Sequence, residues 1–198
     1  MTQMRPFKPM DIPGIYRLAL KTAMKGRNIK NTIHNPDLYG HIFVGPYIFQ
    51  DPTQTLVAVD EYGINAYMSV TQNIKKMDAW ANRNWWSVLQ EQYPKSSPTY
   101  TDFERSIIGM IHNPEQPTIE FAERYPVKVD IRIGKRLDHR DSVEKLLTHC
   151  LDQQWARGVA GIHTDIPIND IETQEIFSAD GFVEDKNILT HTRMVRSL

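Results

Sequence analysis

The alternation of apolar and charged residues is clearest at positions 127–133. Four apolar residues there alternate with Lys128, Asp130 and Arg132, which predicts a strand with one buried face. Residues 142–157 follow with apolar side chains at helical spacing, and Gly158 is expected to end this helix. Residues 161–166 predict a second strand. A strand, a helix and a strand in succession form a crossover unit, so these two strands should be parallel neighbours.

The first half of the chain predicts a helix and a hairpin. Asp11 can cap a helix that Gly26 ends, and residues 55–60 and 64–70 predict two strands around a turn at 60–63. Between them, residues 28–52 are rich in proline and glycine, so we expect mostly loop there with at most one short helix. Residues 171–179 predict a last helix and residues 187–195 a last strand.

Residues 72–126 differ in character from their surroundings and predict a helical insertion. Trp85, Val88 and Leu89 fall on one helical face, and residues 101–104 have capping-box spacing ahead of another apolar stripe. The segment is too short to bury a core of its own, so residues 1–198 are expected to form one domain. The elements together predict an α/β fold, a mixed sheet with helices on both faces.

Composition narrows the function classes. The formal charge is -1, which gives no basic face for nucleic acid or an anionic membrane, so neither is expected as a partner. The single cysteine excludes an internal disulfide, and no apolar stretch predicts a signal peptide or a membrane span. A cytoplasmic protein is expected. The histidines show no metal-ligand spacing, so no metal is expected. Cys150 falls on an apolar helix face and is expected in the core.

The order of elements resembles the GNAT acetyltransferases over nearly the whole chain. The stretch 45–70 is similar to the segment in which that family builds its second and third strands. The insertion, with Trp85-Trp86 and with Tyr125-Pro126 before the long strand, is similar to the bacterial subgroup allied to the acetyltransferase-like domain of O-GlcNAc hydrolases. The resemblance implies transfer of an acetyl group from acetyl-CoA to an amine of a small molecule or a protein, and it leaves a homodimer open.

The resemblance also implies where acetyl-CoA would bind. Val129, Ile131 and Arg132 of the long strand would offer backbone hydrogen bonds. The family holds the pyrophosphate in a glycine-rich turn at a helix N-terminus, and the matching turn here is 138–143. It keeps Arg140, and the other implied contacts are Asp141, Ser142 and Val143. Aspartate and valine replace both glycines, so an ordinary helix N-cap at Asp141 or Ser142 is the competing interpretation, and Gly134 lies too early by this count.

The residues of the chemistry are altered as well. The family position for a tyrosine acid that protonates the thiolate is occupied by Phe177, which has no proton to give and is expected instead as a core aromatic. Asp130 is the candidate base for the amine, with a strand ion pair as its alternative role, and His163 is a weaker candidate. Trp85 and Trp86 could line an acceptor pocket or anchor the insertion. Adjacent helical residues diverge, so at most one of the two would face such a pocket.

Two hypotheses follow from these residues. Either the chain is an acetyl-CoA-dependent N-acetyltransferase with a degenerate cofactor turn, or it is a catalytically impaired relative, a pseudoenzyme, that binds or scaffolds.

Overall fold

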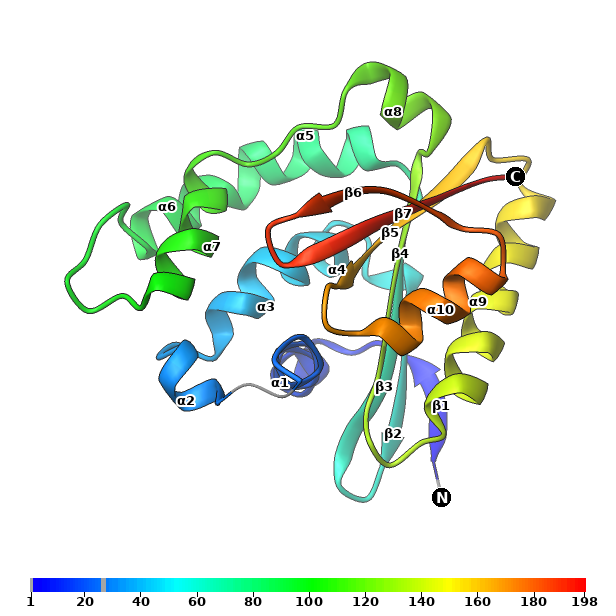
Figure 1. Ribbon diagram of the computed structural model, residues 1–198, viewed down its shortest axis with the longest axis horizontal. Helices are drawn as coiled ribbons and strands as arrows, with labels where there is room; N and C mark the ends of the chain where they lie inside the picture. The colour runs from blue at the N-terminus through cyan, green and yellow to red at the C-terminus, as the bar shows by residue number, and fades with distance from the viewer. Residues whose placement is uncertain (1, 26–27) are drawn as a thin grey trace.

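A computed structural model describes residues 2–25 and 28–198, which fold around a mixed sheet of seven strands (Figure 1). The strands are β1 (Gln3–Pro6), β2 (Thr55–Asp60), β3 (Gly63–Thr71), β4 (Val127–Ile133), β5 (Gly161–Pro167), β6 (Val183–Ile188) and β7 (His191–Ser197). Their order in the sheet is β1-β2-β3-β4-β5-β7-β6. β4 and β5 are parallel, and the other neighbouring pairs are antiparallel. The predicted fold class and the parallel pair are confirmed.

The predicted hairpin and first helix are also present. β2 and β3 meet at Gly63, whose φ of 104° is one that glycine adopts readily. The first helix, α1 (Ile12–Ala23), begins after Asp11, and the carboxylate of Asp11 binds the Arg5 guanidinium at 2.7 and 2.8 Å. This ion pair ties the start of α1 to β1. Gly26, predicted to end the helix, lies outside the described residues.

The prediction of mostly loop at 28–52 is wrong. This stretch forms α2 (Ile29–Thr32), α3 (Asp37–Phe43) and α4 (Gly45–Gln50). Proline does not break α4, because Pro46 lies in its first turn, where no amide donor is required. Gly40 serves close packing: a Cβ there would lie 2.2 Å from the ring of Tyr16. The glycines and prolines therefore mark tight helix packing rather than loop.

The insertion between β3 and β4 forms α5 (Ile74–Asn84), α6 (Trp86–Gln92), α7 (Asp102–His112) and α8 (Ile119–Arg124). The capping box is confirmed: the Thr101 hydroxyl accepts from the Glu104 amide at 3.1 Å, and Glu104 accepts from the Thr101 amide at 2.9 Å. The shared face of Trp85, Val88 and Leu89 is a wrong prediction, since Val88 is 59% exposed. The helix is interrupted at Trp85, and this interruption changes the direction of the following residues.

In the second half of the chain, β4 and α9 (His139–Ala156) form as predicted, but each buries a different set of side chains from the one that its pattern predicted. The alternation predicted that Lys128, Asp130 and Arg132 would face solvent. In the structure β4 is buried on both faces, so these three side chains lie inside the protein. The helix α1 packs against that second face, and Tyr39 of α3 is buried near Arg132. The apolar spacing of α9 predicted that Trp155 would be buried with Cys150, but Trp155 is 69% exposed. Gln154 is buried in its place, because it lies four residues after Cys150 and therefore on the same face of the helix.

The last predicted strand is in fact two strands. After α10 (Ile171–Ala179), β6 and β7 form an antiparallel hairpin whose turn contains Leu189 with φ 47°. Residues 188–191 (Ile-Leu-Thr-His) contain no glycine, proline, asparagine or aspartate, so the sequence showed no turn signal there. The turn places His191 at the start of β7, where it is buried.

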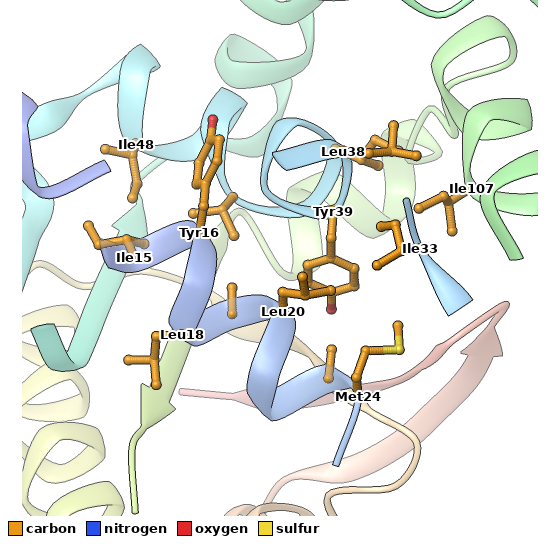
Figure 2. Close-up of a cluster of buried hydrophobic side chains, with 14 of the residues drawn as sticks. Ile15, Tyr16, Leu18, Leu20, Met24, Ile33, Leu38, Tyr39, Ile48 and Ile107 are labelled. Atoms are coloured by element: carbon orange, nitrogen blue, oxygen red, sulfur yellow. The ribbon is translucent and has the colours of Figure 1, made fainter. Parts of the chain in front are cut away.

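The two largest hydrophobic clusters lie one on each face of the sheet. On one face, α1, α3 and α7 pack with Val57 and Tyr67 of the sheet, and Figure 2 shows Ile15, Tyr39 and Ile107 among the side chains of this cluster. On the other face, α9 and α10 pack on β4 and β5. Figure 1 shows α9 and α1 on opposite sides of the strands. Each fully buried aliphatic side chain contributes roughly 1.5–3 kcal/mol.

Candidate functional site

The parallel strands β4 and β5 separate soon after they begin to pair. Cα partners are found at Val127 with Ile162 and at Lys128 with His163, and the two strands then diverge. The Gly134 amide donates to the Asn65 carbonyl at 2.6 Å, which fixes the phase of the β3–β4 ladder. By the antiparallel alternation, Val129 and Ile131 direct their backbone amides and carbonyls away from β3, toward β5. The Val129 carbonyl and the backbone groups of Ile131 therefore face the gap beyond the last pair with β5, and the Ile131 carbonyl accepts from Arg132 Nη1 at 3.3 Å.

A large pocket lies at the carboxyl ends of these two strands. Its volume is about 730 Å³, and its walls come from α1, the β2–β3 turn, residues 133–137, His139 and the start of α10. Its lining side chains include five cations: Arg17, Lys21, Lys25, Lys135 and Arg136. The carboxylates in the lining are Asp11, Asp170 and Glu172. We call this hollow the basic pocket. Its excess of positive charge favours an anionic ligand.

The loop beneath the basic pocket is fixed in place. A Cβ on Gly134 would lie 2.2 Å from Asn65 Oδ1, so only glycine allows this close approach. The Leu137 amide donates to the Gly134 carbonyl at 3.2 Å, which closes a turn. Arg136 donates to Asp60 at 2.7 and 3.0 Å, and this paired contact joins the loop to the β2–β3 turn.

Two buried side chains of the basic pocket carry polar atoms with no hydrogen-bond partner within the described part of the chain, and the nearby His139 Nε2 lies 3.9 Å from Asp170 Oδ1. Asn65 is 1% exposed, and neither its Oδ1 nor its Nδ2 makes a hydrogen bond. Asp170 is 5% exposed, and its Oδ1 likewise makes none. Buried polar groups are nearly always satisfied, because desolvation without a hydrogen bond is costly. A ligand that offers both donors and acceptors would satisfy these groups.

Buried polar residues separate the basic pocket from the other end of β4. Tyr67 donates its hydroxyl to Asp130 Oδ2 at 2.5 Å, and Arg132 lies 2.9 Å from Asp130 Oδ1. The same guanidinium donates to the Asp165 carbonyl of β5 at 3.2 Å, so Arg132 crosses the gap between the strands. Burial alone would lower the pKa of Arg132, but the Asp130 charge outweighs burial and keeps that pKa raised.

A second, smaller cavity lies where β4 and β5 still pair. Its volume is about 80 Å³, and it is lined by Lys128, His163, Trp86 and residues of the insertion and β7. We call it the Trp86 cavity. Trp85 is not in its lining: its indole donates to the His41 carbonyl at 2.8 Å and stacks on Phe49. One tryptophan of the pair thus anchors the insertion, and the other lines a cavity.

Several solved structures are similar to the whole chain. No protein-family model matches the chain, and no curated protein matches its sequence. Among solved structures, the chain is similar to SsHAT, with a TM-score of 0.81, 24% identity and coverage of 99% of this chain and 98% of that one. It is similar to a GNAT superfamily phosphinothricin acetyltransferase from Sinorhizobium meliloti in complex with acetyl-CoA, with a TM-score of 0.55, 12% identity and coverage of 100% and 88%. An agmatine N-acetyltransferase variant in its apo form gives a TM-score of 0.59 at 11% identity, with coverage of 100% and 99%.

The chain has the GNAT fold. The helical insertion between the third and fourth strands is part of this arrangement, as the sequence predicted. Among residues 2–25 and 28–198, every helix is too short or too polar to cross a bilayer.

Within this GNAT fold, the stretch 138–143 starts α9. Asp138, not Asp141 or Ser142, is the N-cap, and its carboxylate accepts from the Asp141 amide at 2.8 Å. Arg140 is exposed and lies 3.4 Å from Glu144, and Asp141 binds Lys145 at 2.8 Å. Ser142 donates its amide to the Asp138 carbonyl at 3.1 Å. Val143 is in the core. None of the residues 140–143 lines the basic pocket, which draws instead on Gly134, Lys135 and Arg136.

The cations of the basic pocket do have a signal in the sequence. Arg17 and Lys21 are four residues apart on α1, which places them on one face of that helix, and Lys25 follows in the turn after it. The pair Lys135-Arg136 directly follows β4. A basic helix face and a basic loop become one pocket only because β3 and β4 bring them together.

Three other sequence candidates lie in packed surroundings. His163 donates from Nδ1 to the Tyr125 carbonyl at 2.9 Å. Burial lowers the pKa of His163 to about 3, so this side chain is neutral near pH 7. Cys150 is fully buried, and burial raises the pKa of its thiol to about 12. Phe177 is 1% exposed and packs edge-to-face on Phe182 with 4.9 Å between ring centroids.

A hydroxyl at position 177 is expected to destabilise the fold. Phe177→Tyr would bury a phenol oxygen beside Phe182 and should cost about 1–3 kcal/mol in urea unfolding. Any release of CoA from acetyl-CoA by the protein is expected to proceed at an unchanged rate, because Phe177 lines neither the basic pocket nor the Trp86 cavity. A rate increase would place residue 177 beside the leaving thiolate and contradict this expectation.

Proposed function

We propose that this chain is an acyltransferase that moves an acetyl group from acetyl-CoA to an amine acceptor. One observation carries the proposal: β4 and β5 diverge after Lys128 and His163, and the basic pocket lies at the end of the gap between them. Elongated ligands with amide groups suit such an edge, because their amides replace the missing strand partner. A similar structure with 12% identity holds acetyl-CoA, which supports the choice of donor.

The residues of the basic pocket fit coenzyme A in charge and in hydrogen bonding. Arg17, Lys21, Lys25 and Lys135 would hold its phosphate groups. The side-chain amide of Asn65 and the backbone of Val129 and Ile131 would pair with the amides of its pantetheine arm. When bound, acetyl-CoA supplies a thioester carbonyl that an amine can attack.

Asp130 keeps the role of candidate base in this proposal. Along the chain, Asp130 lies between Lys128, which lines the Trp86 cavity, and Gly134, which lines the basic pocket. Arg132 and the Tyr67 hydroxyl orient its carboxylate. Arg132 would stabilise negative charge that develops on an attacked carbonyl, provided that its guanidinium shifts from the gap. Trp86 would contact the acceptor, which is a small molecule or a protein amine.

The two cavities draw on residues from α1 to β7, which supports the further proposal that residues 1–198 act as one domain with 72–126 as an insertion. The sequence of this insertion is also the basis on which we propose kinship with the bacterial subgroup allied to the acetyltransferase-like domain of O-GlcNAc hydrolases.

A non-catalytic binding protein is the second candidate. Arg132 fills part of the gap that the donor would need, and Phe177 offers no proton to a leaving thiolate. The Asp138 carboxylate, moreover, occupies the α9 N-terminus, where an anion would otherwise accept amide hydrogen bonds. These three features favour a fold retained for binding or scaffolding.

Calorimetric titration separates the two candidates. If the chain is an acyltransferase, acetyl-CoA should bind with a micromolar Kd in the calorimeter. In a separate thiol assay, addition of a mixture of amines should release free CoA thiol from acetyl-CoA. Binding of acetyl-CoA without thiol release would leave the binding protein. No heat at millimolar acetyl-CoA would overturn the acyltransferase proposal.

A further inference from the structure

The charged groups around the Trp86 cavity are nearly all paired with one another. Asp165 accepts from Lys128 at 2.6 Å and from Arg193 at 2.8 Å. Glu115 accepts from Lys186 at 2.5 Å and lies 3.6 Å from Arg193. The cations of the cavity therefore already have carboxylate partners.

Asp78 of α5 is different. It lines the same cavity, and its Oδ2 atom is buried with no hydrogen-bond partner in the ranges that the structure describes. Burial raises its pKa to about 6, and the nearby charges of Lys128 and Arg193 oppose this shift without bonding to it. The Asp78 side chain is half-buried as a whole, but a buried carboxylate oxygen without a hydrogen bond is costly to the free protein, and a ligand with N–H donors would remove that cost.

The rest of the cavity limits what such a ligand can be. Ile74, Met77, Trp86 and Met110 give it apolar walls, which suit an aliphatic chain. A volume of about 80 Å³ admits on the order of five water-sized groups. The ligand that fits is a short aliphatic chain that ends in a cationic nitrogen.

We propose that Asp78 binds the ammonium group of a small aliphatic amine in the Trp86 cavity. The role of this amine as the acyl acceptor rests on the proposed function. The existence of the cation site does not depend on that function. Asp78 comes from the insertion, so the insertion would supply the acceptor specificity of the site.

The proposal includes a pH dependence. Ammonium binding should strengthen as the pH rises through about 6, since Asp78 becomes ionised over that range. The other titratable or charged groups facing the cavity or paired with its lining are Tyr47, Glu115, Lys128, His163, Asp165, Lys186, His191 and Arg193. Burial lowers the pKa of both His163 and His191 to about 3, so neither histidine changes charge near pH 6.

The test compares n-butylammonium with its neutral analogue 1-butanol by NMR titration at pH 7.5. The protein should bind butylammonium at least tenfold more tightly, as expected for a charge-assisted hydrogen bond, and the preference should fall at pH 5. Asp78→Asn should abolish the preference without lowering the Tm, since the amide removes a buried charge. Asp152→Asn, at an exposed position of α9, is the matched control and should keep the preference.

Each outcome bears on a different claim. Equal binding of butylammonium and butanol by the unmodified protein would overturn the cation site, whatever acetyl-CoA does. Acetyl-CoA binding together with equal amine affinities in the unmodified protein and Asp78→Asn would likewise remove Asp78 and leave the acyltransferase proposal intact. A preference lost in Asp78→Asn, in a protein that does not bind acetyl-CoA, would support the cation site and reject the acyl acceptor.

Discussion

Replacing Asp165 with asparagine is expected to destabilise the protein by about 3–5 kcal/mol. Asp165 is the shared partner of Lys128 and Arg193, and the three side chains are only 10–15% exposed. Removal of the carboxylate leaves two buried cations without their counter-ion, which is the costly way to break a buried ion pair. For a chain of this length, the Tm should fall by roughly 10 °C in a thermal scan. An unchanged Tm would contradict the buried network.

The effect of Asp165→Asn should depend on pH in a defined direction. Burial alone would raise the pKa of Asp165, but Lys128 and Arg193 outweigh burial and hold it well below its usual value. A carboxylate with a depressed pKa stabilises the folded state above its unfolded pKa, about 3.9, and loses this effect as the pH falls toward the folded pKa. The difference in Tm should therefore be constant above about pH 5 and should shrink in stronger acid. Asp152→Asn is the control.

Reversing the charge at Arg17 and Lys21 together should weaken acetyl-CoA binding by about 10- to 100-fold. Both side chains are exposed in the wall of the basic pocket, and neither carries the fold. Two glutamates would repel the phosphates that the proposed function places there. Calorimetry at two salt concentrations gives a second readout, because the affinity of the unmodified protein should decrease with salt more steeply than that of the variant.

The matched control for this variant changes the same net charge elsewhere. Lys95 and Arg157 are both exposed and outside the basic pocket, so their double replacement by glutamate should leave acetyl-CoA affinity within about twofold. Equal losses in the two variants would show that only the net charge matters. Loss in neither would remove the basic pocket as the phosphate site.

Local patterns in the sequence predicted the strands and the longest helices well. The alternation at 127–133, the helical spacing before Gly158 and the capping box at 101–104 all predicted elements that form. These signals work because they depend on neighbours within one or two turns of the chain. The short helices at 28–52 were missed, since Gly40 and Gly45 are required by close contacts with Tyr16 and Trp85, which come from other elements.

The sequence by itself determined the GNAT-like order of elements, the insertion and the candidates Asp130, Trp86 and Phe177. Only the tertiary structure decided which residues share a cavity. It joined Arg17 and Lys21 of α1 to Lys135 beyond β4, and it set Asp78 of the insertion beside Lys128. The physical reason is that sheet pairing brings together residues far apart in the chain, and burial then gives each of them an environment that its sequence neighbours do not record.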